Sequence, residues 1–565
     1  MTEAALLCRR DLALVPGLAP ALAELGRTTE ASAWLVRALA VEPGLAAARI
    51  NLGVLESRAG DVRAALAALA SALGLAPDEP AAWFNLGVVS GRSEGAALAY
   101  RRALALEFAA DAAANLGDVL RSGDPLVRAI PSYRRALALA PAEPRLLESL
   151  AFCLNYDPDA GSGEIFRLNR RWGALMARPP GPGHANTPDP ERRLRVGYLS
   201  ADLGDHPVGR NLVGLIEHHD PAAIEVCIYA ERAADDRIAA RIRARARLWR
   251  ATSGLDDRAL AERMRADAID LLVVLAGHTP FNRLSVAALR PAPVQLAMHD
   301  FTTSGLAAID AVLCDEALVP EGGEEGFVER PERIPSFYLH DPLPDAPIQE
   351  RPPLGADGPL LLVSASNPAK LNDRVIDLWG RILSHLPRAR LVLKYRERFG
   401  DPAIRRRWIA RIAARGIGAE RLIFHVGDEE LDRHLAVLGG CDIGLDPFPF
   451  NGCTTTYEAL WMGLPVIALT GKRFVGRTSA AMLGTLGLPE LLAADEDGYL
   501  ATVLALAADP GRRADLRAGL RPRLLASALL DARAHARAVQ AAYRRLWRAW
   551  CARRAPGAKE RNTAR

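Results

Sequence analysis

The chain contains 565 residues, about four times the length of a typical domain, which predicts two to four separately packed units. Charged residues make up 24% and the apolar set (Ala, Val, Ile, Leu, Met, Phe, Trp, Tyr, Cys) 50% of the chain, which excludes a wholly disordered or low-complexity protein. The 71 basic and 67 acidic residues leave a net charge of +4, and no dense basic run with interleaved aromatic residues precedes the Arg-rich C-terminus. Nucleic acid is therefore not an expected partner, and the lack of a long uncharged apolar segment argues against a membrane as well.

Residues 1–155 are helical in pattern and repeat themselves. The triplet Asn-Leu-Gly begins at Asn51 and again at Asn85, and the similar phrases ALAVEP and ALGLAP end at Pro43 and Pro77, each pair 34 residues apart. This period, with small residues where paired helices cross and a proline after the second helix, resembles tetratricopeptide repeats. We expect about four imperfect repeats that stack into a solenoid with a groove for protein partners. A generic alanine-rich helical bundle is the weaker alternative.

A segment rich in proline and glycine separates these repeats from the rest of the chain. Residues 156–192 are expected to hold a transition helix and then the linker RPPGPGHANTPDPE. Beyond it, short apolar runs alternate with amphipathic stretches, which indicates βα units. The runs fall into two groups, which predicts one Rossmann-like domain over 193–345 and a second over 346–545. Residues 546–565 form a basic tail that we expect to be disordered.

The predicted strands define the fold class. They are 194–200, 269–275, 293–298 and 309–315 in the first domain and 360–366, 390–395, 421–426, 441–446 and 465–470 in the second. We therefore expect an α-helical repeat solenoid followed by an α/β fold of two Rossmann-like domains that face a cleft. Ligands of such sheets bind at the carboxyl ends of the strands.

The stretch LDPFPFNGCTTTYEALWMGLPVIAL, residues 445–469, is the most informative motif. Its strand is followed by a turn at Asn451 and Gly452 and by a helix that opens with Thr454 and Thr455. Hydroxyls and free backbone N–H groups at a helix start suit an anion such as a diphosphate. Glu458, one turn further on, could accept hydrogen bonds from a ribose. An ordinary threonine-capped helix is the alternative.

Four further side chains fall at predicted strand ends or beside the cleft. Lys370 follows the strand 360–366 and could neutralise a leaving diphosphate, although a solvated surface lysine is equally compatible with the sequence. His206 and His278 each follow a strand of the first domain, so both are expected at the opposite rim as a base or as sugar ligands. His434, on a predicted helix, could stack on a nucleotide base or lie on the surface.

The motifs VGYLSADLGDHPVG, DLLVVLAGHTPFNRL, LRPAPVQLAM, SNPAKL and LDPFPFNGCTTTYEALW, following the repeats, together resemble the bacterial, SPINDLY-like branch of the protein O-GlcNAc transferases. The resemblance covers essentially the whole chain. It implies a GT-B glycosyltransferase that inverts the anomeric centre and transfers GlcNAc from UDP-GlcNAc to Ser or Thr hydroxyls of proteins bound by the repeat groove. No metal and no other cofactor are implied.

The resemblance also implies roles for individual residues. His206 matches the cleft histidine proposed as base or acceptor-positioning group, and His278 belongs to the GHT motif of the bacterial branch. Lys370 and Asn367 match contacts to the diphosphate. The remaining matches are Thr454 and Thr455 at the diphosphate, Glu458 at the ribose and His434 near the uracil.

Two departures from the family pattern leave the donor open. Where relatives read WLGYPGTTGL, this chain has MHDFTTSGL at 298–306, and Leu431 stands where a basic residue is common. A protein O-fucosyltransferase that uses GDP-fucose is therefore one alternative. A repeat scaffold that binds nucleotide without turnover is another.

The expected compartment is the reducing cytoplasm. The seven cysteines are scattered and never spaced as CxxC, and the sequence shows neither a signal peptide nor a long apolar segment. The sequence leaves open whether the chain forms a homodimer.

Overall fold

The computed structural model describes residues 14–107, 109–123, 125–179, 183–343, 347–348, 359–427 and 430–554. The chain divides into two compact units, Met1–Cys153 and Leu154–Arg565. The division lies close to the boundary expected at residue 155.

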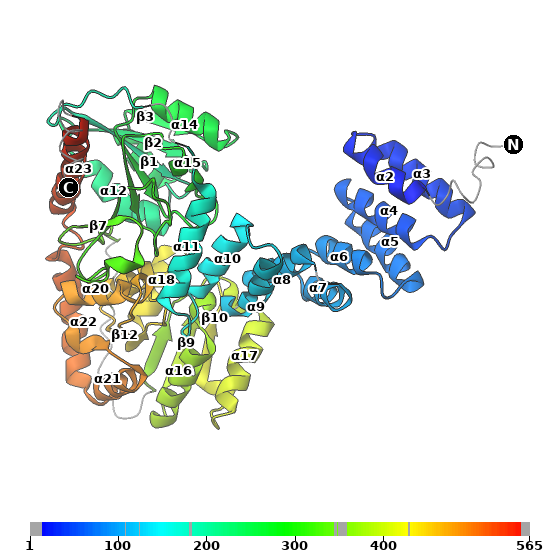
Figure 1. Ribbon diagram of the computed structural model, residues 1–565. Coiled ribbons are helices and arrows are strands. Elements are labelled where there is room, and N and C mark those ends of the chain that lie inside the picture. The colour runs from blue at the N-terminus through cyan, green and yellow to red at the C-terminus, as the bar shows by residue number, and fades with distance from the viewer. Residues whose placement is uncertain are drawn as a thin grey trace. The chain divides into compact units, whose positions relative to one another are not determined.

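The first unit consists of helix pairs. Neighbouring helices pack as α2 with α3, α4 with α5, α6 with α7 and α8 with α9, and Figure 1 shows them in blue. Their bounds are α2 Val15–Glu24, α3 Thr28–Val41, α4 Ala46–Arg58, α5 Val62–Leu75, α6 Pro80–Val89, α7 Glu94–Leu106, α8 Ala110–Ser122 and α9 Ile130–Leu139, followed by α10 Pro144–Leu154. These four pairs among the described residues confirm the repeat architecture.

The glycine of each Asn-Leu-Gly triplet lies where the two helices of a pair cross. A Cβ at Gly53 would lie 2.8 Å from Leu69, one at Gly87 2.7 Å from the Tyr100 ring, and one at Gly117 2.6 Å from the Tyr133 ring. Since real Cβ atoms do not approach so closely, glycine allows the large side chain of the second helix to fill the crossing.

We expect Gly117→Ala to open the last helix pair. Tyr133 is fully buried, so it has no free space into which to move, and overpacking of this kind costs about 1–3 kcal/mol. Hydrogen–deuterium exchange of the full chain should show faster exchange in α8 and α9, by about 5- to 100-fold.

Gly74→Ala is the matched control, because a Cβ at this position in α5 meets nothing within 4 Å. It should leave exchange unchanged or slow it. Equal effects of the two substitutions would contradict the crossing argument.

The second unit contains two parallel sheets. The first has the order β3-β2-β1-β4-β5-β6-β7 and the second the order β10-β9-β8-β11-β12-β13. The strands of the first sheet are β1 Leu194–Ser200, β2 Ile224–Ala230, β3 Leu248–Ala251, β4 Leu271–Leu275, β5 Val294–Met298, β6 Ala311–Cys314 and β7 Arg330–Arg333. Those of the second are β8 Leu361–Ser364, β9 Arg390–Lys394, β10 Leu422–His425, β11 Ile443–Leu445, β12 Val466–Leu469 and β13 Leu492–Ala493. All paired strands run parallel, so the two Rossmann-like domains are confirmed.

Each sheet reverses its strand order once, between β1 and β4 in the first and between β8 and β11 in the second. Crevices at such reversals, outside the carboxyl ends of the strands, are where doubly wound sheets bind ligands. The loops that meet there include 201–206 and 276–283 in the first domain and 365–370 and 446–452 in the second.

Every predicted strand is present, but four observed strands are absent from the prediction. The strands β3, β7 and β13 have only two to four residues and lie at or next to sheet edges, where the apolar signal is weak. The strand β2 is almost wholly buried and carries an apolar run, so the sequence contained enough signal to identify it.

Helices cover the faces of both sheets. They are α11 Ser162–Met176, α12 Pro207–His218, α13 Arg237–Arg245, α14 Asp257–Ala266, α15 Ser285–Ala288, α16 Asp373–His385, α17 Pro402–Ala413, α18 Leu431–Gly439, α19 Thr454–Trp461, α20 Thr478–Thr485, α21 Glu496–Ala508, α22 Pro510–Leu525 and α23 Ala532–Arg554. The expected transition helix within 156–192 is α11.

The position of the C-terminal helix α23 corrects two of the predicted domain boundaries. The expectation of a disordered tail from 546 is wrong up to Arg554, because α23 continues to that residue and buries Trp547, Trp550 and Cys551. The remainder, 555–565, lies outside the described residues. The assignment of 532–545 to the second domain is also wrong, since α23 packs against α12 and β5 of the first domain (Figure 1).

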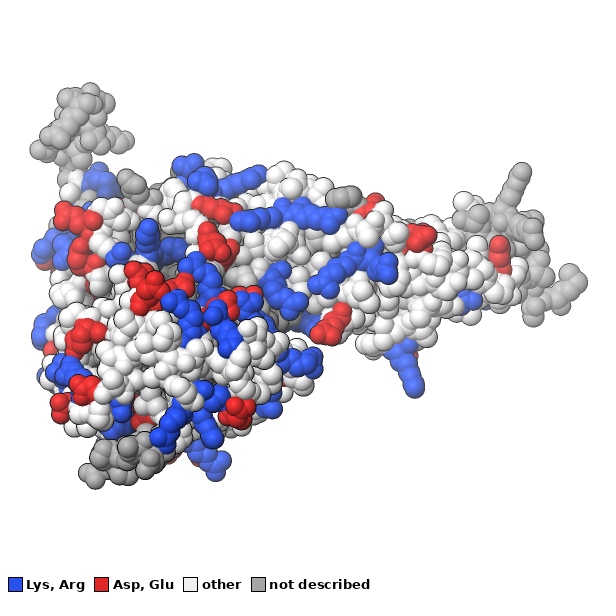
Figure 2. All heavy atoms as spheres, turned by 90° about the horizontal axis from the view of Figure 1, so that it is seen from below, with Lys and Arg blue, Asp and Glu red and all other residues white. Residues whose placement is uncertain are grey.

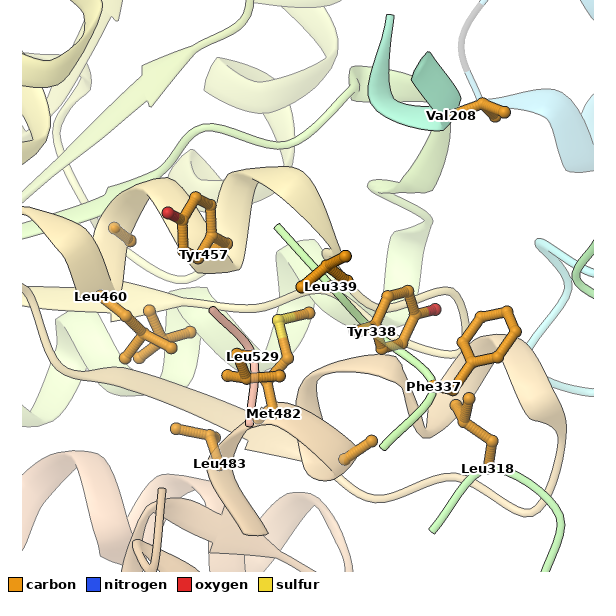
Figure 3. Close-up of a cluster of buried hydrophobic side chains, with 14 of the residues drawn as sticks. Val208, Leu318, Phe337, Tyr338, Leu339, Tyr457, Leu460, Met482, Leu483 and Leu529 are labelled. Atoms are coloured by element: carbon orange, nitrogen blue, oxygen red, sulfur yellow. The ribbon is translucent and has the colours of Figure 1, made fainter. Parts of the chain in front are cut away.

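The core is continuous between the two domains. The segment that leaves β7 buries Phe337, Tyr338 and Leu339, and Figure 3 shows the last two lying among Tyr457 of α19 and Met482 of α20. Apolar contact across the seam means that the two domains pack as one body.

Basic and acidic side chains are intermixed on the face of the molecule in Figure 2. Across the described ranges, no helix is both long enough and apolar enough to cross a membrane.

Candidate active site

A cleft of about 530 Å³ lies between the carboxyl ends of the two sheets. It is lined by Asp205, Pro207 and Arg210 of the first domain and by Ala365, Lys394, Tyr395, Arg396, Gly427, Glu430, Leu431, His434, Thr454, Thr455 and Glu458 of the second. Residues more than 200 positions apart in the chain therefore form one concave site, as the two-domain prediction requires.

The N-terminus of α19 forms one wall of the cleft. Thr454 and Thr455 line it, and the Thr454 hydroxyl oxygen is buried without a hydrogen-bond partner. Cys453 stands at the N-cap, and its side chain caps no backbone N–H group. The first turn thus offers unpaired hydroxyl and amide donors, which suits an oxyanion. The third threonine of the run, Thr456, instead bonds to Ser479 in the core at 2.9 Å.

The turn before α19 is held by a buried carboxylate. Asp446 accepts a hydrogen bond from the Gly452 amide at 2.7 Å, and burial raises the pKa of Asp446 to about 6. A Cβ at Gly452 would lie 2.3 Å from the Thr456 hydroxyl and 2.7 Å from Asp446, so only glycine fits. The sequence predicted a role for Gly452 but not for Asp446. The position of Asp446 directly after β11 could have identified it as a site residue.

Lys370 lies beside this turn rather than in solution. Its ammonium donates to the carbonyl of Asn451 at 2.6 Å and lies 4.3 Å from the centre of the Phe450 ring. Burial lowers the pKa of Lys370 to about 8, although the nearby Asp446 and Cys453 act in the opposite direction. The structure therefore excludes the alternative of a solvated surface lysine.

Asn367 supports the loop that carries Lys370. Its side-chain oxygen accepts from the amide of Ala369 at 3.0 Å and so caps the short 3-10 turn Pro368–Lys370. Asn367, Lys370, Asn451 and Gly452 lie behind the cleft wall and are not among the residues that line it. Asn451 and Gly452 form the turn that meets the loop of Lys370. Both loops follow β8 and β11, the strands at which the order of the second sheet reverses.

Glu458 joins the two domains across the cleft. One carboxylate oxygen lies 3.1 Å from Nε2 of His434, and the other accepts from Arg210 of the first domain at 3.3 Å. Glu458 and His434 therefore lie together, as expected of a nucleoside-binding end, and Arg210 is an additional member that the sequence did not reveal.

Three more lining residues were also missed. Lys394 is the last residue of β9, Tyr395 and Arg396 follow it, and Arg396 has a positive φ of 44°. Non-glycine residues in this left-handed region are uncommon and often functional. The sequence could have revealed them, because they stand at the carboxyl end of a predicted strand, as the predicted site residues do.

His206 caps α12 at the rim of the cleft, between the lining residues Asp205 and Pro207. Its Nδ1 accepts from the Val208 amide at 3.4 Å and lies 3.9 Å from Asp202. Burial lowers the pKa of His206; Asp202 opposes this, whereas Arg396 and Arg210 add to it. A neutral imidazole whose Nδ1 accepts a hydrogen bond carries its proton on Nε2, which is then a donor.

His278 does not join the cleft, which corrects the expectation that both histidines face it. It is buried, its Nε2 donates to the Ser304 carbonyl at 3.1 Å, and its ring packs edge-on against Trp172 of α11. Because His278 follows a strand, the sequence correctly predicted that it lies at the carboxyl edge of the sheet. The neighbouring loop 298–306, however, covers its side chain. The geometry gives His278 a structural role.

The loop 298–306 is fastened to its surroundings. Thr303 donates to the buried carboxylate of Glu329 at 2.6 Å, and the amide of Ser304 donates to it at 2.7 Å. Gly305, at φ 74°, lies directly against α11, where a Cβ would be 2.0 Å from the Asn169 carbonyl. The loop is therefore a rigid wall.

In the parts of the chain that the structure describes, no three His, Cys, Asp or Glu side chains are grouped so that they could hold a metal ion.

A family model for glycosyl transferase family 41 matches residues 175–341 and 363–539, more than half of the chain. The chain belongs to glycosyltransferase family 41. The matched ranges of family 41 contain every sequence-predicted site residue, from His206 and His278 to Glu458.

Individual relatives are consistent with this family assignment. A protein of Solanum lycopersicum, named a probable UDP-N-acetylglucosamine–peptide N-acetylglucosaminyltransferase SPINDLY, is 32% identical over 412 residues, which is 70% of this chain and 44% of that protein. The protein of the same name from Petunia hybrida is 31% identical over 412 residues, again 70% of this chain and 44% of that protein. The chain therefore spans less than half the length of these family 41 relatives.

A solved structure matches a larger share of both chains. A mutant of the Thermobaculum terrenum O-GlcNAc transferase is 36% identical, covers 90% of this chain and 98% of its own, and superposes with a TM-score of 0.76.

The position of Lys370 predicts a pH dependence for anion binding. Its pKa lies at about 8, so the ammonium is charged below pH 8 and loses its proton as the pH rises through that value. We expect the affinity for a nucleoside diphosphate to fall about tenfold between pH 7 and 9. Isothermal titration calorimetry with UDP and with GDP would measure the change.

Lys370→Met is the matched control, because any titration of the nucleotide itself affects both proteins equally. The variant should bind more weakly at pH 7 and show less change with pH than the wild type. Parallel curves for the two proteins would contradict the assignment.

Proposed function

We propose that this chain is an inverting protein O-glycosyltransferase that transfers GlcNAc from UDP-GlcNAc to Ser or Thr hydroxyls of proteins. The hydroxyl oxygen attacks the anomeric carbon, the bond from that carbon to the diphosphate breaks, and UDP leaves. The observation that carries the proposal is the anion-binding start of α19 beside Lys370, in a cleft of a family 41 fold. The 36% identity to an O-GlcNAc transferase over 90% of the chain supports the same donor.

The leaving diphosphate would be stabilised by the protein's own cations. The ammonium of Lys370 lies at the turn that precedes α19, and the unpaired Thr454 hydroxyl lies at its start. Arg396 adds positive charge to a wall of the cleft, whereas the charge of Arg210 is paired with Asp205 and Glu458. Preorganised donors and charges of this kind stabilise a transition state without a divalent ion, so the proposed reaction requires no metal.

The proposed nucleoside end lies at His434 and Glu458. The carboxylate that bridges His434 and Arg210 could accept from ribose hydroxyls, and the His434 ring could stack on the base. Leu431 also lines this end, where a basic residue is common in the family.

A second candidate donor is GDP-fucose. The loop 298–306 and Leu431 both depart from the usual O-GlcNAc transferase pattern, and Leu431 lies on the cleft wall. A third candidate, a scaffold that binds nucleotide without turnover, is less compatible with the buried cation and unpaired hydroxyl beside α19.

The geometry of His206 favours a positioning role over that of general base. With Nδ1 accepting from the Val208 amide, the neutral ring carries its proton on Nε2 and has no free lone pair for a proton. In the proposed reaction His206 therefore donates a hydrogen bond to the acceptor or sugar oxygen. An oxygen of the donor phosphate takes the proton of the attacking hydroxyl.

We further propose that the repeat unit binds the protein acceptors and that the enzyme acts in the cytoplasm. Stacked helix pairs are typical of surfaces that bind extended peptides. The described cysteines are free, which is compatible with a reducing compartment.

Donor turnover tests the proposal. Purified full-length protein should release UDP from UDP-GlcNAc faster than it turns over UDP-glucose or GDP-fucose, and EDTA should not change the rate. Lys370→Ala should lower kcat about 100-fold, because it removes roughly 3 kcal/mol of charge stabilisation.

Preference for GDP-fucose would replace the donor in this proposal. Near wild-type turnover by Lys370→Ala would contradict the role of the lysine. Tight UDP binding with no turnover of any donor in the presence of protein acceptors would favour the scaffold.

The role of His206 can be tested with a substitution that keeps a donor. His206→Gln retains an N–H group but cannot act as a base at neutral pH, so we expect it to keep at least about a tenth of the wild-type kcat. His206→Ala should lose about 100-fold. If the two variants are equally inactive, His206 acts as the base.

A further inference from the structure

A second cavity, of about 420 Å³, lies in the second unit, Leu154–Arg565, outside the cleft described above. Its walls come from the start of α11, the loop 301–302, the segment 318–327 and the segment 472–477. The apolar part includes Phe166, Phe301, Phe327 and Phe474. Of these segments, only the loop 301–302 belongs to a motif for which the sequence implies a role.

Three cations line this cavity: Lys472, Arg473 and Arg477. Arg473 donates to the carbonyls of Leu154 and Asp157 at 2.8 and 2.7 Å, and Arg477 donates to the carbonyl of Ala317 at 3.3 Å. Neither guanidinium forms an ion pair with a described carboxylate, and Nε of Arg477 is buried without a hydrogen-bond partner. Burial lowers the pKa of both Arg473 and Arg477; the nearby Asp157 opposes this at Arg473, and no carboxylate does so at Arg477.

Partly buried guanidinium groups without counter-ions are energetically costly. Glu321 is the one described carboxylate that lines the cavity, against three cations. The cavity therefore retains positive charge and an unused buried donor, which are the features of a site for an oxyanion.

The cavity adjoins the centre of the proposed reaction. Phe301 lines it, and the centre of the Phe301 ring lies 5.8 Å from that of Phe450. Phe450 in turn lies 4.3 Å from the ammonium of Lys370 and stacks on Tyr156 at 4.8 Å. A row of aromatic rings thus leads from the cavity to the cation at which the diphosphate would leave.

We propose that this cavity is a subsite for an acidic side chain of the protein acceptor. The inference rests on the proposed function, because it is the transfer reaction that brings an acceptor to Lys370. The carboxylate or phosphate of the acceptor segment pairs with Arg477 and Lys472, and neighbouring apolar side chains pack on Phe301 and Phe474. The enzyme then prefers acceptors with an acidic residue beside apolar ones, at a distance from the modified hydroxyl.

The test is a binding measurement with short labelled peptides. A fluorescein-labelled peptide of alternating phenylalanine and glutamate is compared with the matched phenylalanine–glutamine peptide by fluorescence anisotropy. The full-length protein is used with saturating UDP, so that the nucleotide cleft does not bind the acidic peptide. We expect the glutamate peptide to bind at least tenfold more tightly at 50 mM NaCl, with a smaller difference at 300 mM.

Two variants locate the site. Lys472→Glu changes an exposed side chain, and Arg477→Gln removes the partly buried charge while keeping a polar side chain. In each, the ratio of glutamate to glutamine affinities should fall to threefold or less. Arg406→Gln, an exposed arginine of α17 outside both cavities, is the control and should keep the wild-type ratio.

Equal affinities of wild type for the two peptides would overturn the proposal, as would a ratio that stays tenfold in both variants. A third peptide with phosphoserine in place of glutamate distinguishes the sources of the charge. Binding more than tenfold tighter than that of the glutamate peptide assigns the subsite to phosphorylated acceptors, and weaker discrimination assigns it to carboxylates.

Failure here is distinguishable from failure of the proposed function. A protein that turns over UDP-GlcNAc but does not discriminate the peptides lacks the subsite and keeps the activity. A protein that discriminates the peptides through Arg477 but turns over no donor keeps the anion site and loses the proposed reaction.

Discussion

The contact between the Lys370 ammonium and the Asn451 carbonyl, 2.6 Å long, connects the two loops at the reversal of the second sheet. One loop follows β8 and the other follows β11 and leads into α19. A buried ammonium with a carbonyl partner retains a net positive charge, unlike one paired with a carboxylate. The same contact therefore fixes the turn before α19 and leaves a charge for the ligand.

The geometry of the cleft depends on how the two domains are joined. His340 stacks on Tyr457 of α19 with ring centres 4.1 Å apart, and the Tyr457 hydroxyl donates to the carbonyl of Asp341. The helix α23 then returns from the second domain and packs on the first. Because these contacts are buried, they hold the walls that carry Arg210 and Glu458 at hydrogen-bond distance from each other.

The second unit, Leu154–Arg565, contains cations in two different environments. Arg210 and Arg241 pair with carboxylates and stabilise the fold, whereas Lys370 and Arg477 donate to carbonyl oxygens and form no ion pair with a described carboxylate. The cost of desolvating Lys370 is only partly offset by the nearby Asp446, and no described carboxylate offsets that of Arg477. This difference, rather than the small net charge of the chain, indicates where negatively charged groups bind.

The sequence alone determined the repeat unit, the two parallel sheets and the edge of the second sheet at which the proposed diphosphate site lies. These depend on local patterns: a 34-residue period, apolar runs of strand length, and threonines after an Asn-Gly turn. Only the tertiary structure separated His206 from His278, because both follow a strand and differ in what packs over them: an open cleft rim for one, and Trp172 with Ser304 for the other. The partners of Glu458 and the carbonyl contact of Lys370 likewise come from residues distant in the chain, and such long-range contacts leave no local periodic signal.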